Sequence, residues 1–175
     1  MGNQQTILPG RCYWVIEGVF LAGNYPYNPG IDEPEEFLKQ LLSIGINTFI
    51  DLTEEDKLTH YQPVLVKLSH GEIFYRRFEI MDYSVPTLEQ MQKVIAEINL
   101  SLKKGRRVYL HCRGGIGRTG TTVGCWLRDQ GLSGQEALDK TALLFSASNA
   151  ARYTQSPETE EQKQMVINYQ LELRE

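Results

Sequence analysis

The chain has 175 residues, of which 41% are hydrophobic and 23% charged, so it has the size and composition of one ordinary globular domain. These values exclude intrinsically disordered and collagen-like proteins. A net charge of −4 at pH 7 gives no electrostatic basis for general binding to nucleic acid.

Hydrophobic periodicity and turn residues predict strands that alternate with helices along most of the chain. The first element is a hairpin or two short strands over 13–21, around a Glu17-Gly18 turn. Later, Thr87 and Gln90 form a capping box at the start of a long helix. Ser156-Pro157 is interpreted as the N-cap and first position of a C-terminal helix. The long helix is predicted over 87–103. The other predicted elements are a loop over 25–30, a helix over 35–44, strands over 47–52, 73–80 and 107–111, and helices over 119–129 and 133–145.

This alternation predicts the α/β class, with a central mixed and mostly parallel sheet flanked by helices. No linker divides the sequence, so we interpret residues 1–175 as a single domain, with 1–10 as a flexible start. No apolar run approaches the roughly 20 residues that span a bilayer, and we expect no membrane partner.

The three cysteines are Cys12, Cys112 and Cys125. Because no Cys-x-x-Cys pair occurs, they suggest neither a disulfide framework nor a zinc site. Free thiols fit a reducing compartment, and we expect a cytoplasmic protein. Cys125 lies among apolar residues of a predicted helix and is interpreted as a core residue. Cys12 lies close to the flexible start and is given no role.

A glycine-rich loop joins the strand over 107–111 to the next helix, with the sequence His111-Cys112-Arg113-Gly114-Gly115-Ile116-Gly117-Arg118-Thr119. Glycines let successive backbone N–H groups turn toward one centre, which makes a nest that binds anions. The N-terminus of the following helix adds partial positive charge at the same place. Arg118 offers a planar fork of donors suited to two phosphate oxygens. The loop is therefore predicted to cradle a phosphate or a similar oxyanion.

Cys112 stands at the foot of this predicted cradle. A cysteine attacks as its thiolate, and the helix N-terminus, the amides and Arg118 all favour that form. Taken singly, Cys112 could be a small buried hydrophobe and the glycines a simple turn. The spacing of Cys, five residues and Arg between a strand and a helix weighs against both interpretations. A Walker nucleotide loop does not match, because the chain has no Gly-Lys-Ser or Gly-Lys-Thr.

The pattern of His111-Cys112, five residues and Arg118-Thr119 resembles the signature of the protein-tyrosine-phosphatase superfamily, and its Gly-Gly-x-Gly-Arg-Thr form resembles the dual-specificity branch. The resemblance implies a phosphatase-like fold and hydrolysis of phosphomonoesters through a phosphocysteine, with no metal or cofactor. Cys112 would attack phosphorus, His111 would set the environment of the thiolate, and Thr119 would donate its hydroxyl toward the sulfur. Arg118 would clamp phosphoryl oxygens, and backbone amides would complete the substrate-binding loop from Arg113, Gly114, Gly115, Ile116, Gly117 and Arg118.

The leaving group needs a proton, which a carboxylic acid upstream of the loop would supply. Asp51, Asp56 and Asp82 are the candidates. Asp82 lies 30 residues before Cys112, in a loop that Pro86 closes, and its place resembles that of the family's general acid. We therefore predict Asp82 as the acid, its alternative being a solvated loop residue or a helix-capping carboxylate. Asp51 ends a predicted buried strand, where a structural hydrogen-bonding role is expected.

Two weaker candidates lie near the C-terminus. The segment 158–162 resembles the family's glutamine loop, which implies that Gln162 positions the hydrolytic water. An exposed glutamine on an amphipathic helix is the alternative. Arg152 fits equally well a contact to the phosphate of a substrate and an ion pair with an acidic side chain.

The leading functional interpretation is a protein phosphatase that acts on phosphotyrosine, with phosphoserine and phosphothreonine as further substrates. The main alternative is an inositol-phosphate or phosphoinositide phosphatase of the same chemistry. Such family members tend to carry extra lysines in the loop, whereas here Arg113 is the one basic residue between Cys112 and Arg118. A module that captures phosphorylated partners without hydrolysis is less favoured, because the nucleophile, the arginine and an acid are all present.

Overall fold

The computed structural model describes residue 8 and residues 10–169. The predicted flexible start therefore lies largely outside the described residues. A five-stranded sheet has the order β1-β2-β5-β3-β4. Its strands are β1 (Tyr13–Ile16), β2 (Phe20–Gly23), β3 (Thr48–Asp51), β4 (Phe74–Arg77) and β5 (Val108–His111). The β1–β2 hairpin is antiparallel and the other neighbouring pairs are parallel, which confirms the predicted mixed, mostly parallel sheet.

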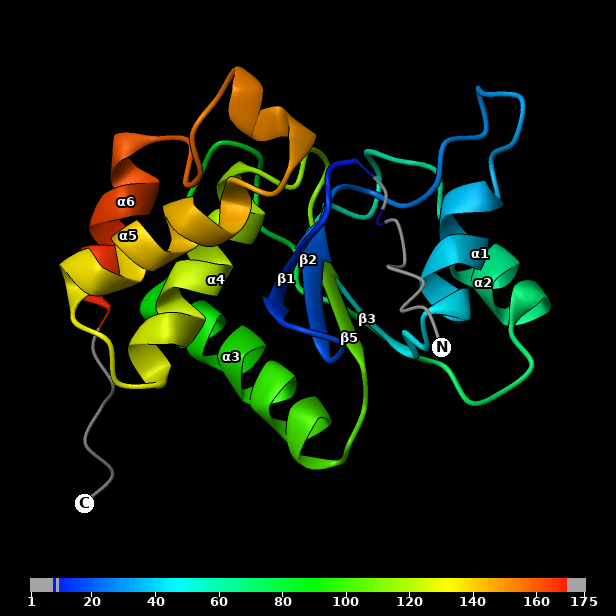
Figure 1. Ribbon diagram of the computed structural model, residues 1–175, viewed down its shortest axis with the longest axis horizontal. Coiled ribbons are helices and arrows are strands. Elements are labelled where there is room, and N and C mark those ends of the chain that lie inside the picture. The colour runs from blue at the N-terminus through cyan, green and yellow to red at the C-terminus, as the bar shows by residue number, and fades with distance from the viewer. Residues whose placement is uncertain (1–7, 9, 170–175) are drawn as a thin grey trace, which may run out of the picture.

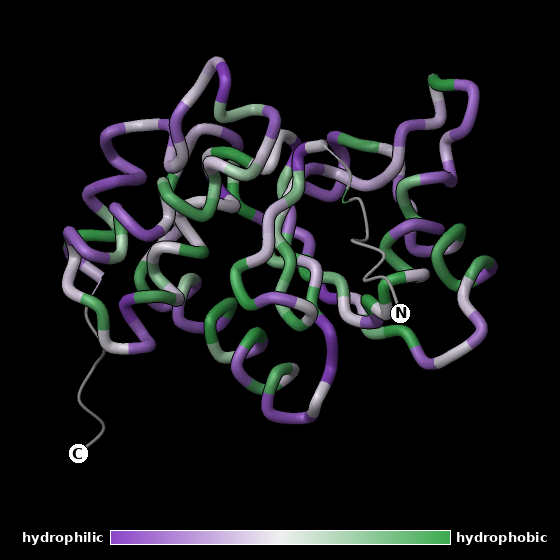
Figure 2. Tube along the Cα trace, in the orientation of Figure 1, coloured by the Kyte–Doolittle hydropathy of each residue, from purple (hydrophilic) through white to green (hydrophobic). Residues whose placement is uncertain are grey.

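Helices cover both faces of the sheet (Figure 1). On one face lie α1 (Glu36–Ser43) and α2 (Gln62–Leu68), and on the other lie α3 (Leu88–Lys103), α4 (Gly117–Asp129), α5 (Gly134–Phe145) and α6 (Glu160–Asn168). A short 3₁₀ helix, η1 (Asn149–Arg152), precedes α6. Figure 2 shows hydrophobic and hydrophilic residues alternating along these helices, as expected where one side of each helix is buried. None of the helices in the described part of the chain is long and apolar enough to cross a bilayer.

A hydrophobic core lies on each face of the sheet. Successive side chains of a strand point to opposite faces, so the strands contribute residues to both cores. Ile50 and Leu110 belong to the core under α3–α6, whereas Phe49 and Tyr109 belong to the core under α1 and α2. The carboxyl ends of the strands are in register, with Gly23 and Asp51 both paired to His111. Loops that follow β2, β3 and β5 therefore meet at one edge of the sheet, where α/β folds place their ligands.

The predicted cap of α3 is confirmed, since Thr87 and Gln90 form a complete capping box, and Ser133 and Glu136 form another at the start of α5. The predicted start of the last helix is wrong. Its N-cap is Thr159, because the Ser156 hydroxyl instead donates to the carbonyl oxygen of Ile116 at 2.6 Å.

Two further differences concern short or early segments. Helix α2 was not predicted, because its seven residues include a proline and two valines, which favour other conformations. Cys12 is a core residue with 3% exposure, and its sulfur lies 3.5 Å from the hydroxyl oxygen of Tyr109. The prediction that gave it no role is wrong to the extent that it helps to fill the core under α1 and α2.

Candidate active site

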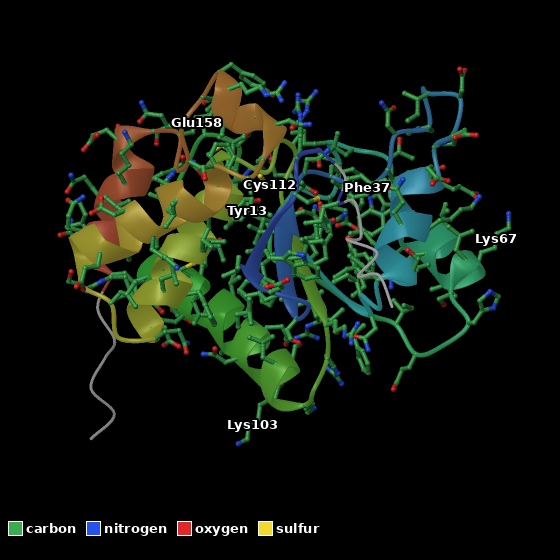
Figure 3. The ribbon with its side chains drawn as sticks, viewed as in Figure 1. Tyr13, Phe37, Lys67, Lys103, Cys112 and Glu158 are labelled. Atoms are coloured by element: carbon green, nitrogen blue, oxygen red, sulfur yellow. The ribbon has the colours of Figure 1, made fainter. Side chains whose placement is uncertain are left out.

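The predicted cradle lies between β5 and α4, at the carboxyl edge of the sheet (Figure 3, Cys112). Gly115 has a φ of +73°, a backbone conformation that residues with a side chain rarely adopt. A Cβ atom at Gly115 would also stand 2.5 Å from the backbone carbon of Gly23. The loop is thus pressed against the end of β2, and the N–H of Tyr25 donates to the carbonyl oxygen of Arg113 at 3.0 Å. Two independent constraints therefore require glycine at position 115.

Helix α4 begins at Gly117, and no side chain caps its N-terminus. The other long helices on this face carry capping boxes, so their first N–H groups are satisfied. In α4 the first amides are left for a ligand, and the helix dipole makes that ligand an anion. Cys112 lies beside this turn with 3% exposure, and the Thr119 hydroxyl donates to its sulfur at 3.0 Å. The structure brings together the predicted nucleophile and the hydroxyl predicted to assist it.

Arg118 is buried beneath the loop, with 3% exposure. Its Nη1 donates to the carbonyl oxygen of Ile80 at 2.9 Å and to Glu54 at 3.2 Å. Its Nη2 pairs with Oδ1 of Asp82 at 3.0 Å. Its Nε is buried and has no partner among the described residues. An unmet donor of this kind is costly unless a ligand accepts from it. The guanidinium is therefore fixed by carboxylates, with one donor still free for an anion.

Of the three acids considered from the sequence, Asp82 is the one that forms an ion pair with Arg118. Its side chain is 45% exposed, and Oδ1 also accepts from the N–H of Tyr83 at 3.0 Å. Tyr83 has a φ of 58°, an uncommon conformation for an aromatic residue, so this turn is held in shape by its surroundings. Asp56 is exposed and forms no ion pair with Arg118.

Asp51 has the structural role that was predicted. It is fully buried, accepts from the N–H and hydroxyl of Thr53, and pairs with Tyr75 at 2.7 Å and Arg77 at 3.1 Å. Burial acts to raise the pKa of Asp51, but nearby His111 and these hydrogen bonds outweigh it, and the pKa is lowered. A carboxyl group held ionised in this way is a poor proton donor.

His111 is fully buried behind the loop, between Tyr61 and the backbone of Cys112. Its Nδ1 lies 3.1 Å from the carbonyl oxygen of Cys112, which can only accept, so Nδ1 carries the proton. Burial lowers the pKa of His111, although the Asp51 carboxylate opposes this, and the lowered pKa favours the neutral ring. Nε2 must then accept, and the Tyr61 hydroxyl donates to it at 2.6 Å. Tyr61 therefore orients the ring that holds the Cys112 backbone.

We expect Tyr61→Phe to slow the alkylation of Cys112 by iodoacetate and to lower kcat by about fivefold, the equivalent of roughly 1 kcal/mol for one lost hydrogen bond. The matched control is Tyr25→Phe. Tyr25 also packs edge to face on His111, at 5.3 Å, but its hydroxyl donates to the carbonyl oxygen of Thr59. Equal effects of the two substitutions on the alkylation rate would show that packing, rather than the Tyr61 hydrogen bond, carries the effect.

Gln162 is fully buried, so its interpretation as an exposed helical residue is wrong. Its Oε1 accepts from the N–H groups of Glu158 and Thr159, each at 3.0 Å, and its Nε2 donates to the carbonyl oxygen of Ser84 at 3.4 Å. A Cβ atom at Gly117 would lie 2.9 Å from that Nε2. The start of α6 is thus tied both to the loop that holds Asp82 and to the first turn of α4.

Sequence reasoning missed Glu54 and Tyr61 and gave Glu158 no role of its own, and all three come close to the site through tertiary contacts. The one available signal was the position of Glu54 directly beyond β3, at the edge where the ligand loops meet. Arg152 lies at the end of η1, is exposed, and forms no ion pair with a described residue. The predicted alternative of an ion pair for Arg152 is therefore not supported by the structure.

Comparisons with known proteins agree with this geometry. The family model described as "Swiss Army Knife protein, DSP-PTPase phosphatase domain" matches residues 9–166. The tyrosine-protein phosphatase cdc-14 of Caenorhabditis elegans is 27% identical over 141 residues, covering 74% of this chain and 18% of that protein. The chain spans about half the length of the first two curated relatives that it matches, at 55% and 51%.

Two solved structures share the fold. Tk-PTP in its active form superimposes with a TM-score of 0.73 at 23% identity, covering 93% of this chain and 97% of that one. PTPMT1 in complex with PI(5)P superimposes with a TM-score of 0.68 at 21% identity, covering 90% and 93%.

Proposed function

The chain belongs to the DSP-PTPase phosphatase family, and from this premise we propose that it hydrolyses phosphomonoesters through a phosphocysteine on Cys112. One observation carries the proposal. The Cys112 sulfur, which accepts from Thr119 at 3.0 Å, lies beside an uncapped helix N-terminus and a buried Arg118 whose Nε has no partner among the described residues. This set of groups suits a thiolate and a phosphoryl group together.

In the first step, the Cys112 thiolate attacks phosphorus and the bond from phosphorus to the leaving oxygen breaks. A carboxylic acid, Asp82 in this proposal, protonates that oxygen. In the second step, water attacks the phosphocysteine, gives a proton to the same carboxylate and releases phosphate. Thr119 stabilises the departing thiolate. Gln162 is proposed to position the water, although three of its hydrogen bonds are already made within the protein.

We propose phosphotyrosine in proteins as the main substrate, with phosphoserine and phosphothreonine as further substrates. The charges around the site support a substrate with a single phosphate. Arg118 is already paired with the carboxylates of Glu54 and Asp82. A polyphosphorylated inositol ring would need additional cations in place of these carboxylates. A cytoplasmic location fits this proposal, because a reducing compartment keeps the Cys112 thiol free.

The test is a substrate panel assayed with reductant and a metal chelator. We expect turnover of phosphotyrosine peptides, weaker turnover of phosphoserine and phosphothreonine peptides, and background rates with soluble inositol phosphates. The chelator should have no effect. Turnover of inositol phosphates with background rates on every peptide would contradict the proposed substrate. Tight binding of phosphopeptides without turnover would instead identify a phosphopeptide-binding module.

A further inference from the structure

The Glu158 carboxylate lies against the first turn of α4. A Cβ atom at Gly117 would be 3.0 Å from its Oε2, so the glycine leaves room for this side chain. The backbone of Glu158 is held in place, because its N–H donates to Oε1 of the buried Gln162 at 3.0 Å. Figure 3 shows Glu158 in the upper part of the view, on the segment that leads into α6, and Cys112 nearer the middle of the molecule. The backbone of Glu158 is therefore fixed beside the turn that receives the phosphate, and its exposed carboxyl group lies against that turn.

Glu158 and Asp82 differ in the partners of their carboxyl groups. The Asp82 carboxylate is paired with the Arg118 guanidinium at 3.0 Å. Glu158 forms no ion pair with a described residue. Burial of its carboxyl group raises the pKa of Glu158, the Asp82 carboxylate raises it further, and Arg118 opposes both. A carboxyl group whose pKa is raised holds its proton to a higher pH, which suits it to act as an acid.

We propose that Glu158 is a second proton donor to the leaving group, acting in parallel with Asp82. This inference rests on the proposed phosphatase function. As the sulfur of Cys112 bonds to phosphorus and the P–O bond to the leaving group breaks, the carboxyl proton of Glu158 passes to the leaving oxygen. The products are a neutral alcohol or phenol, the phosphocysteine and the Glu158 carboxylate. Water then attacks phosphorus and returns one proton to that carboxylate as the S–P bond breaks.

Parallel donors leave a kinetic signature. When either acid can protonate the leaving group, a variant that lacks one acid still has the other. Only the variant that lacks both loses the whole rate enhancement from protonation of the leaving group. We therefore expect Asp82→Asn and Glu158→Gln each to lower kcat/KM for phenyl phosphate by less than about tenfold. The double variant should lose about 10²–10³-fold, which is the range for general acid catalysis and more than the product of the two single losses. The double loss should shrink with 4-nitrophenyl phosphate, because 4-nitrophenolate departs without a proton.

The matched control is Glu161→Gln, an exposed residue of α6 three positions away, which should leave kcat/KM unchanged. Both amide substitutions keep the size of the side chain, and unchanged thermal unfolding would verify the fold. Glu158→Asp, which keeps the carboxyl group but withdraws it, should lie between wild type and Glu158→Gln when each is made in the Asp82→Asn background.

Two results would overturn the inference in different ways. The first result concerns kcat/KM for phenyl phosphate. If the double variant were less than twofold slower than Asp82→Asn alone, Glu158 would not be a proton donor, while the cysteine mechanism would stand. If Cys112→Ser kept wild-type activity, the proposed function itself would fall, and this inference with it.

Discussion

Replacing Cys112 with serine is expected to lower the turnover of aryl phosphates by at least about 10⁴-fold, as for nucleophiles that act within a concerted set of groups. The cause is chemical, because a serine hydroxyl in this position has no adjacent base to activate it and is not ionised by the helix N-terminus. The fold should persist, since the serine oxygen can still accept from the Thr119 hydroxyl that now donates to sulfur at 3.0 Å. The measurement is kcat with 4-nitrophenyl phosphate in the presence of reductant.

The matched control for Cys112→Ser is Cys125→Ala. Cys125 is fully buried in the core and lies eight residues after the start of α4, about 12 Å along the helix at 1.5 Å per residue. Its removal should reduce stability slightly and leave kcat unchanged. Inorganic phosphate should protect wild type and Cys112→Ser equally against thermal unfolding, because the amides and Arg118 remain. Survival of more than about 1% of kcat in Cys112→Ser would contradict covalent catalysis by this residue.

The second large effect is expected for Arg118→Lys, which should lower kcat by about 10²–10³-fold, as removal of a preorganised donor to the transition state does. Lysine keeps the positive charge but has no planar fork, so it cannot pair with Glu54 and Asp82 and also offer Nε to a phosphoryl oxygen. The measurement is kcat and KM with phenyl phosphate. The loss should fall mainly on kcat, because the phosphoryl oxygen that accepts from Nε is held most strongly as charge develops on it.

Arg76→Lys is the matched control for this substitution. The Arg76 side chain is 63% exposed and pairs with Glu97 at 3.8 Å on the surface, so the same exchange should leave kcat within error of wild type. A loss confined to KM in Arg118→Lys would show that the guanidinium contributes only to the binding of the ground state. It would contradict a role for Arg118 in the transition state.

Local features explain why much of the fold could be predicted. The capping boxes at Thr87 and Ser133 each lie within four residues, and the alternation of the strands is a property of neighbouring residues. The start of α6 was predicted wrongly because Ser156 has a suitable side chain for an N-cap, yet its hydroxyl is used by the distant Ile116. Helix α2 was missed because its short, proline-containing segment gains its stability from packing of Tyr61 and Leu65 in the core.

The sequence by itself determined the loop from Cys112 to Arg118, because its nucleophile, glycines, arginine and following helix are contiguous and the glycines restrict the conformations of the loop. Only the tertiary structure decided which charged groups surround it. Glu54 and Asp82 reach Arg118 from 64 and 36 positions away, Tyr61 reaches His111 across 50 positions, and Glu158 reaches Gly117 across 41. No local propensity encodes such contacts, because they depend on the parallel register that aligns Gly23, His111 and Asp51 and on the packing of α2 and α6 around that edge.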